Sequence, residues 1–133
     1  MATNDTGANS TMAQHLLSEI ISGGINFILV DQTPLYTDGD VDLSKVVTEA
    51  IPETDLQVNP ASGFDDAAII EVTAEHAIDV SAETATVQEA VIQNQSDVDR
   101  FVLADETNNP DLSQIDTYTI EAGTTIYEFG HVA

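Results

Sequence analysis

Hydrophobic and polar positions follow two different patterns along the chain, one before and one after about residue 53. The first pattern begins in residues 11–21, where apolar side chains recur at helical spacing. Five of them fall on one helical face: Met12, Leu16, Leu17, Ile20 and Ile21. Gly23 and Gly24 follow, and glycine commonly ends helices because it adopts the left-handed backbone conformation without strain. We therefore predict an amphipathic helix of about 10 residues.

A short apolar run and a second helix-like pattern come next. Residues 25–30 (INFILV) are mostly β-prone and too few for a helix, so they predict a buried strand. Residues 31–39 are rich in turn-forming residues. In residues 42–51 apolar side chains return at helical spacing, and Pro52 follows them. These side chains are Leu43, Val46, Val47, Ala50 and Ile51. We expect a second short helix there.

Beyond residue 53 the chain changes to short segments rich in Val, Ile and Thr, separated by Asn, Asp, Pro and Gly. The candidate strands are residues 67–73, 77–80, 84–93, 98–104, 117–121 and 125–129. Gly123, within residues 121–124, predicts a hairpin turn between the last two strands. The predicted fold is mainly β, an antiparallel β-sandwich with one or two short N-terminal helices. We expect one domain over residues 11–133, preceded by a flexible or partner-ordered arm over residues 1–10.

The charge of the chain indicates the salt concentration at which it can fold. Its 24 Asp and Glu residues face only two cations, Lys45 and Arg100, which gives a formal net charge of -22. Repulsion between exposed carboxylates reaches about 30 Å at 0.01 M salt but only about 3 Å in molar salt. Disordered acidic chains are poor in aliphatic residues, whereas 42% of this chain is hydrophobic. We therefore predict a folded protein adapted to very strong salt.

The same composition limits the partners and the chemistry that we expect. Two isolated cations cannot form a phosphate-binding patch, which argues against nucleic acid and anionic membranes as partners. The chain has no cysteine, so it has neither disulfides nor thiol nucleophiles. Residues 1–12 lack the basic and then apolar order of a secretory signal, so we expect no export by that route.

Candidate reactive side chains are few. His15, His76 and His131 have no metal-binding spacing, so we expect ordinary surface or interface roles for them. No nucleophile, phosphate-binding or dinucleotide motif is present, which favours a non-enzymatic protein without a cofactor.

One acidic segment resembles the calcium-binding loop of an EF-hand. The candidate metal ligands alternate and end at the twelfth position: Asp38, Asp40, Asp42 and Glu49. Leu43 stands at the sixth position, where the sharp turn of that loop requires glycine. A divalent cation here is one alternative, and a solvated acidic loop is the other.

Two motifs carry a resemblance to a known group of proteins. Residues 86–92 (TVQEAVI) resemble a central strand of the type T-I-x-E-x-G-L, with Val91 in place of the glycine. Residues 120–126 (IEAGTTI) resemble a closing hairpin of the type V-x-x-G-x-T-L. Both are similar to segments of small virion proteins of tailed phages, which occur in tail fibres, necks and head surfaces. The resemblance implies a mostly β virion protein that forms homo-oligomers and binds other virion proteins, without catalytic residues.

These observations together give an expected function and its alternatives. We expect a structural component of a tailed virus of halophilic archaea, assembled in the host cytoplasm into the virion. Capsid decoration, turret, neck, tail and baseplate all remain open as its position. The first alternative is a cytoplasmic binding or regulatory domain of a haloarchaeon. The second is a small hydrolase or a carbohydrate-active β-sandwich.

Overall fold

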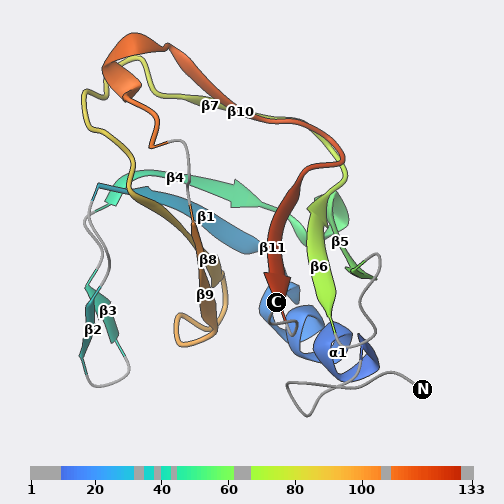
Figure 1. Ribbon diagram of the computed structural model, residues 1–133. Helices are drawn as coiled ribbons and strands as arrows, with labels where there is room; N and C mark the ends of the chain where they lie inside the picture. The colour runs from blue at the N-terminus through green and yellow to red at the C-terminus, as the bar shows by residue number, and fades with distance from the viewer. Residues whose placement is uncertain are drawn as a thin grey trace.

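The structure is a computed structural model, which describes residues 10–31, 35–37, 40–42, 45–61, 67–105 and 109–129. Over these residues the chain is mainly β, with antiparallel sheets and one α-helix, as the sequence predicts. Figure 1 shows the helix beside one end of two sheets, with a long ribbon of two strands arching over the other end. Residues 1–9 of the predicted arm lie outside the described part of the chain.

The largest sheet, here called the main sheet, has four antiparallel strands. Their order is β4 (Lys45–Ile51), β1 (Ile25–Val30), β8 (Glu89–Asn94) and β9 (Phe101–Asp105). The predicted strand at residues 25–30 is β1, which lies in the interior of this sheet. Because side chains alternate along a strand, Ile25, Phe27 and Leu29 enter the principal hydrophobic core. Ile28 and Val30 point to the opposite face and form a smaller cluster with Val91.

A second sheet of three strands packs with the helix. It consists of β11 (Thr125–Phe129), β6 (Ala68–Val72) and β5 (Leu56–Pro60). The predicted helix is confirmed as α1 (Ser10–Ile21), which contacts β5, β6 and β8. Its buried side is narrower than the predicted apolar face, because Ala13, Leu17 and Ile21 are buried while Met12 and Leu16 are 51% and 43% exposed.

Asn94 ties the end of α1 to the main sheet. Its side-chain amide donates hydrogen bonds to the carbonyl oxygens of Ile20 (2.8 Å) and Ser22 (2.7 Å), and only 2% of the residue is exposed. Gly23 and Gly24 have φ angles of 82° and 99°, so the two residues that end the helix are in the left-handed region that favours glycine. The chain then enters β1 directly.

The two-stranded ribbon consists of β7 (His76–Asp79) and β10 (Thr117–Ile120). The predicted hairpin between the last two strands is wrong, because β10 pairs with β7 whereas β11 pairs with β6. The predicted turn itself is present, with Gly123 at a φ of 89°. The backbone N–H of Gly123 donates a hydrogen bond to the carbonyl oxygen of Val72 at 2.7 Å. This bond joins the turn between β10 and β11 to the end of β6, where the ribbon leaves the three-stranded sheet.

The second predicted helix is also wrong. Residues 45–51 form β4, which pairs along its length with β1, and β3 (Asp40–Asp42) precedes it. The β-branched side chains of Val46, Val47 and Thr48 favour a strand, and the apolar spacing fits both conformations. β3 pairs with β2 (Leu35–Thr37), within the segment expected to be turns.

The strands predicted after residue 53 are confirmed. Each of the six candidate segments overlaps a strand of the structure: β6, β7, β8, β9, β10 and β11. The additional strand β5 was not predicted, nor were two short 3-10 helices, η1 (Glu53–Asp55) and η2 (Leu112–Gln114). The sequence of β5 (LQVNP) contains Asn and Pro, which are depleted in strands, and that composition hides it.

Candidate functional site

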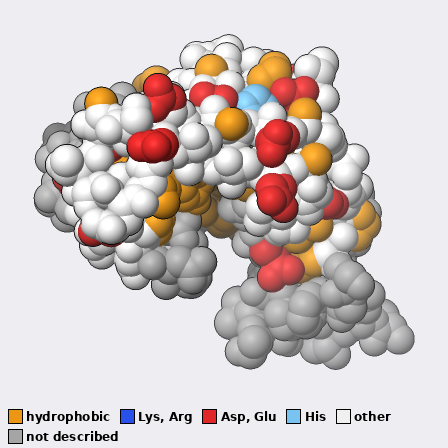
Figure 2. All heavy atoms as spheres, turned by 90° about the horizontal axis from the view of Figure 1, so that it is seen from above, with side chains coloured by type: hydrophobic (Ala, Val, Ile, Leu, Met, Phe, Trp, Pro, Cys, Tyr) orange, Lys and Arg blue, Asp and Glu red, His pale blue; other side chains and the backbone are white. Residues whose placement is uncertain are grey.

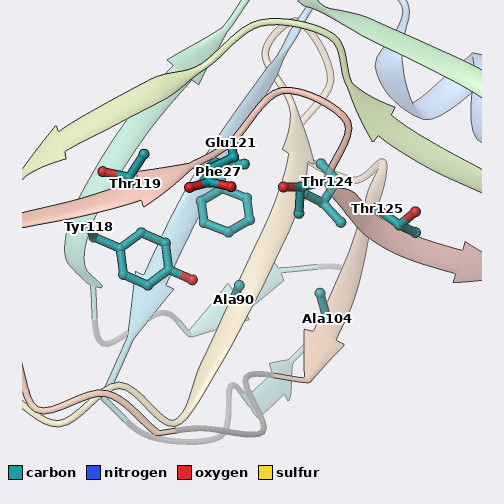
Figure 3. Close-up of a pocket in the computed structure, with 10 residues that line it drawn as sticks. Phe27, Ala90, Ala104, Tyr118, Thr119, Glu121, Thr124 and Thr125 are labelled. Atoms are coloured by element: carbon teal, nitrogen blue, oxygen red, sulfur yellow. The ribbon is translucent and has the colours of Figure 1, made fainter.

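A cavity of about 340 Å³ lies between the main sheet and the segment that joins β10 to β11 (Figure 3). Phe27, Ala90 and Ala104 line it from β1, β8 and β9. Ala90 pairs directly with Ala104 in the register of β8 and β9. Two facing alanines fill less space than the Val, Ile and Leu that surround them, so the hollow follows from the sequence at this pair.

The other side of the cavity is more polar. Tyr118, Glu121 and Thr124 line it from β10 and the following turn, and Figure 3 shows them opposite the strands of the main sheet. The rings of Tyr118 and Phe27 lie 6.5 Å apart between centroids, tilted by 30°. Ligand pockets usually start at about 300 Å³, so the cavity is large enough for a small molecule. Among the described residues, Glu121 is the one charged residue that lines the cavity, and its negative charge disfavours anions.

A second hollow, here called the apolar groove, has a volume of about 430 Å³ and lies between α1, β9 and β11. Its apolar lining includes Leu16, Ile20, Phe101, Val102, Tyr127 and Phe129. Leu16 is 43% exposed, and Met12, one helical turn earlier on α1, is 51% exposed. Figure 2 shows the molecule from above, with acidic side chains spread over that face and hydrophobic ones at the surface between them. The groove therefore adds an apolar contact surface to a strongly acidic protein.

Arg100 lies at the edge of the apolar groove between two carboxylates. Its Nη1 is 3.1 Å from Oε2 of Glu19 on α1, and its Nε is 3.2 Å from Oδ2 of Asp97. All three side chains are close to half exposed. This arrangement links α1 to the start of β9 on the surface.

His76 occupies a more enclosed position, and its side chain is only 11% exposed. Its Nδ1 is 2.9 Å from Oε2 of Glu49, and its Nε2 is 2.9 Å from Oδ2 of Asp55. Glu49 belongs to β4, Asp55 to η1 and His76 to β7. The histidine thus joins the main sheet, the chain entering the three-stranded sheet, and the ribbon.

Two opposing effects act on the pKa of His76. Burial lowers this pKa, because the charged imidazolium loses hydration. The hydrogen bonds and the negative charges of Glu49 and Asp55 raise it, and together they outweigh burial. The net result is a pKa above the ordinary value of 6.5, so the folded protein holds this proton more tightly than an unperturbed imidazole would.

The sequence analysis missed this cluster. Glu49 and Asp55 are 27 and 21 residues away from His76, so no local spacing connects them. One signal was present: His76 lies two residues before Ile78, and residues two apart in a strand share a face. A titratable residue on the apolar face of a strand needs charged partners, and that rule could have marked His76.

The predicted metal ligands are not brought together as a described site. Asp38 lies outside the described residues, and Asp40 and Asp42 lie in β3, where their side chains are not described. Glu49 lies in β4 and contacts His76. Among the described residues, no three His, Cys, Asp or Glu side chains are grouped to hold a metal ion. The divalent cation stays a prediction.

Of the other two histidines, His15 lies on the surface of the helix. His15 is 73% exposed on α1, with its Nε2 3.9 Å from Oε1 of Glu19 one turn later. That surface position fits the expectation from the sequence. His131 lies outside the described residues.

Comparison with known proteins gives no relative. No protein family, no curated protein and no solved structure matches this chain. In the part of the chain that the structure describes, no helix is both long and apolar enough to span a membrane.

Proposed function

We propose that this protein is a structural subunit of a virus particle of salt-loving microbes, and that it associates with copies of itself and with neighbouring particle proteins. The observation that carries the proposal is the apolar groove between α1, β9 and β11. Apolar surface that stays exposed on a folded domain commonly marks a contact with another protein. Here it includes the aromatic side chains of Phe101, Tyr127 and Phe129, a residue type enriched at the core of protein interfaces.

The acidic composition supports an interface of this kind. Copies with a formal charge of -22 repel each other in dilute salt. In molar salt the repulsion is screened within about 3 Å, so copies can approach. Attraction must then come from apolar contacts and backbone hydrogen bonds, because exposed ion pairs are screened as well. The apolar groove offers the first of these.

The test is the oligomeric state of the purified protein in molar KCl, measured by sedimentation equilibrium. We expect an oligomer in molar salt and dissociation or unfolding at about 0.01 M salt, where repulsion reaches about 30 Å. Leu16→Asp places a charge in the groove, so we expect it to weaken self-association by about a hundredfold or more.

A matched control separates the groove from the added charge. Ile115 is also an exposed hydrophobic residue, at 37%, but it does not line the groove. Ile115→Asp adds the same charge and should leave the oligomer unchanged. A wild-type monomer in molar salt at high concentration, or equal losses in both variants, would contradict a groove-mediated assembly.

The virus-particle part of the proposal needs its own measurement. Antibody labelling of purified particles, viewed by electron microscopy, should place this chain at repeated positions on the particle. A chain found only in the host cytoplasm and never in particles would favour the alternative of a binding or regulatory domain.

A further inference from the structure

The ribbon of β7 and β10 turns an apolar face toward the core, and His76 is part of that face. In the ribbon register Ile78 lies opposite Tyr118, and His76 lies opposite Ile120. Ile78 and Ile120 are 3% and 4% exposed, whereas the alternate residues Ala77, Asp79, Thr117 and Thr119 are exposed. An ionisable ring on such a face loses hydration and needs partners for both nitrogens.

Both partners of His76 are carboxylates from other elements, and this makes the contact depend on a proton. An ionised carboxylate only accepts hydrogen bonds, so both 2.9 Å contacts are hydrogen bonds only when both ring nitrogens donate. The neutral ring has one donor and one acceptor. After loss of the proton, one nitrogen lone pair would face a carboxylate oxygen, which is repulsive.

Among the described residues, the charged groups in contact with the His76 ring come from two other elements. β4 contributes Glu49 and η1 contributes Asp55. From β10, the residue opposite His76 is the apolar Ile120. Glu53, also in η1, accepts a hydrogen bond from the backbone of Gly23 instead. Glu75, the preceding residue in the chain, is exposed.

We infer that protonated His76 is a latch that holds the β7–β10 ribbon onto β4 and η1, and that alkaline pH loosens the ribbon. The ribbon also carries Tyr118, which lines the cavity opposite Phe27 (Figure 3). Loosening the ribbon would therefore change the cavity wall as well. Apolar contacts of Ile78 and Ile120 continue to hold the ribbon, so the latch adjusts its stability rather than detaching it.

The direction of the pH effect follows from linkage. The pKa of His76 is raised in the folded protein above its ordinary value of 6.5. The folded state therefore binds this proton more tightly than the unfolded state. The stabilisation is fully present below pH 6.5 and is lost as the pH rises through the raised pKa.

The test combines two measurements on the full chain in molar KCl. The first is an NMR titration of the His76 ring, which should titrate above 6.5. The second is hydrogen exchange of the backbone amides of Thr117–Ile120, corrected for the intrinsic effect of pH. Between about pH 6 and pH 9, we expect their protection to fall by about tenfold relative to that of β1.

Two variants decide whether His76 causes the change. His76→Gln cannot gain a proton, so its ribbon should exchange faster at the lower pH and lose most of the pH dependence. His15→Gln removes the exposed histidine on α1 and should behave as wild type. A ring that titrates at or below 6.5 in wild type would overturn the latch even if His76→Gln failed to fold. An undiminished pH dependence in folded His76→Gln would do the same.

Discussion

His76 in its protonated form and Arg100 are cations that each lie between two carboxylates, but their surroundings are very different. The side chain of His76 is 11% exposed, and its ring contacts Glu49 and Asp55 at 2.9 Å. The side chain of Arg100 is 46% exposed, and its contacts with Glu19 and Asp97 are 3.1 and 3.2 Å long. The number of partners and the signs of the charges are the same. Burial is the main difference.

The exposure of each ion cluster decides how much it contributes to the stability of the fold in strong salt. Exposed ion pairs are worth about 0 to 1 kcal/mol even in ordinary buffers, and molar salt screens them further. Salt ions and water reach the enclosed ring of His76 far less, so its contacts survive screening. In molar salt, the enclosed cation therefore contributes more to stability than the exposed one.

The largest effect should come from replacing the enclosed cation. His76→Ala leaves the carboxylates of Glu49 and Asp55 close together without a cation, at a site where both are less than a third exposed. Removing one partner of a buried charge cluster typically costs about 3 to 5 kcal/mol. Because these carboxylates retain some contact with water, we expect the lower end, about 3 kcal/mol, from urea denaturation in molar KCl.

The exposed histidine supplies the control for that measurement. His15→Ala removes a ring that is 73% exposed, and we expect a change within about 0.5 kcal/mol. Equal losses in His76→Ala and His15→Ala would remove the distinction between enclosed and exposed cations.

The sequence could predict the elements that depend on local contacts better than those that depend on tertiary contacts. Local patterns were sufficient for α1 and β1, because their apolar side chains lie within one short segment. The same patterns failed for residues 42–51, where Val46, Val47, Ala50 and Ile51 have a spacing that suits a helix. Pairing with β1 decided the outcome there, and pairing is a tertiary interaction.

The candidate sites were less predictable than the strands, because each is assembled from distant segments. The alanine pair Ala90 and Ala104 makes a hollow only once the register of β8 and β9 is known. His76 obtains its role from Glu49 and Asp55, which β4 and η1 bring to it. The acidic composition even concealed this cluster, since a chain with 24 Asp and Glu residues offers many carboxylates that have no such role.

A pair of double-mutant cycles would measure the difference between the two cations directly. One cycle combines Glu49→Gln with His76→Gln, and the other combines Glu19→Gln with Arg100→Gln. We expect a coupling energy of about 1 to 2 kcal/mol for Glu49 and His76 in molar KCl, because their contact is shielded from salt. For Glu19 and Arg100 we expect less than about 0.5 kcal/mol. Similar coupling energies in both cycles would show that burial does not separate the two sites.

The smallest effect should come from Arg100→Gln alone. Gln keeps part of the side-chain length and can still donate a hydrogen bond to Glu19 or Asp97, so little packing is lost. In molar salt we expect a loss of stability within about 0.5 kcal/mol, measured by urea denaturation. The loss should grow when KCl is lowered as far as the fold tolerates, because Arg100 then offsets unscreened repulsion between Glu19 and Asp97. A loss in molar salt as large as that of His76→Ala would mean that the enclosed position of His76 gives its charge no special protection from salt.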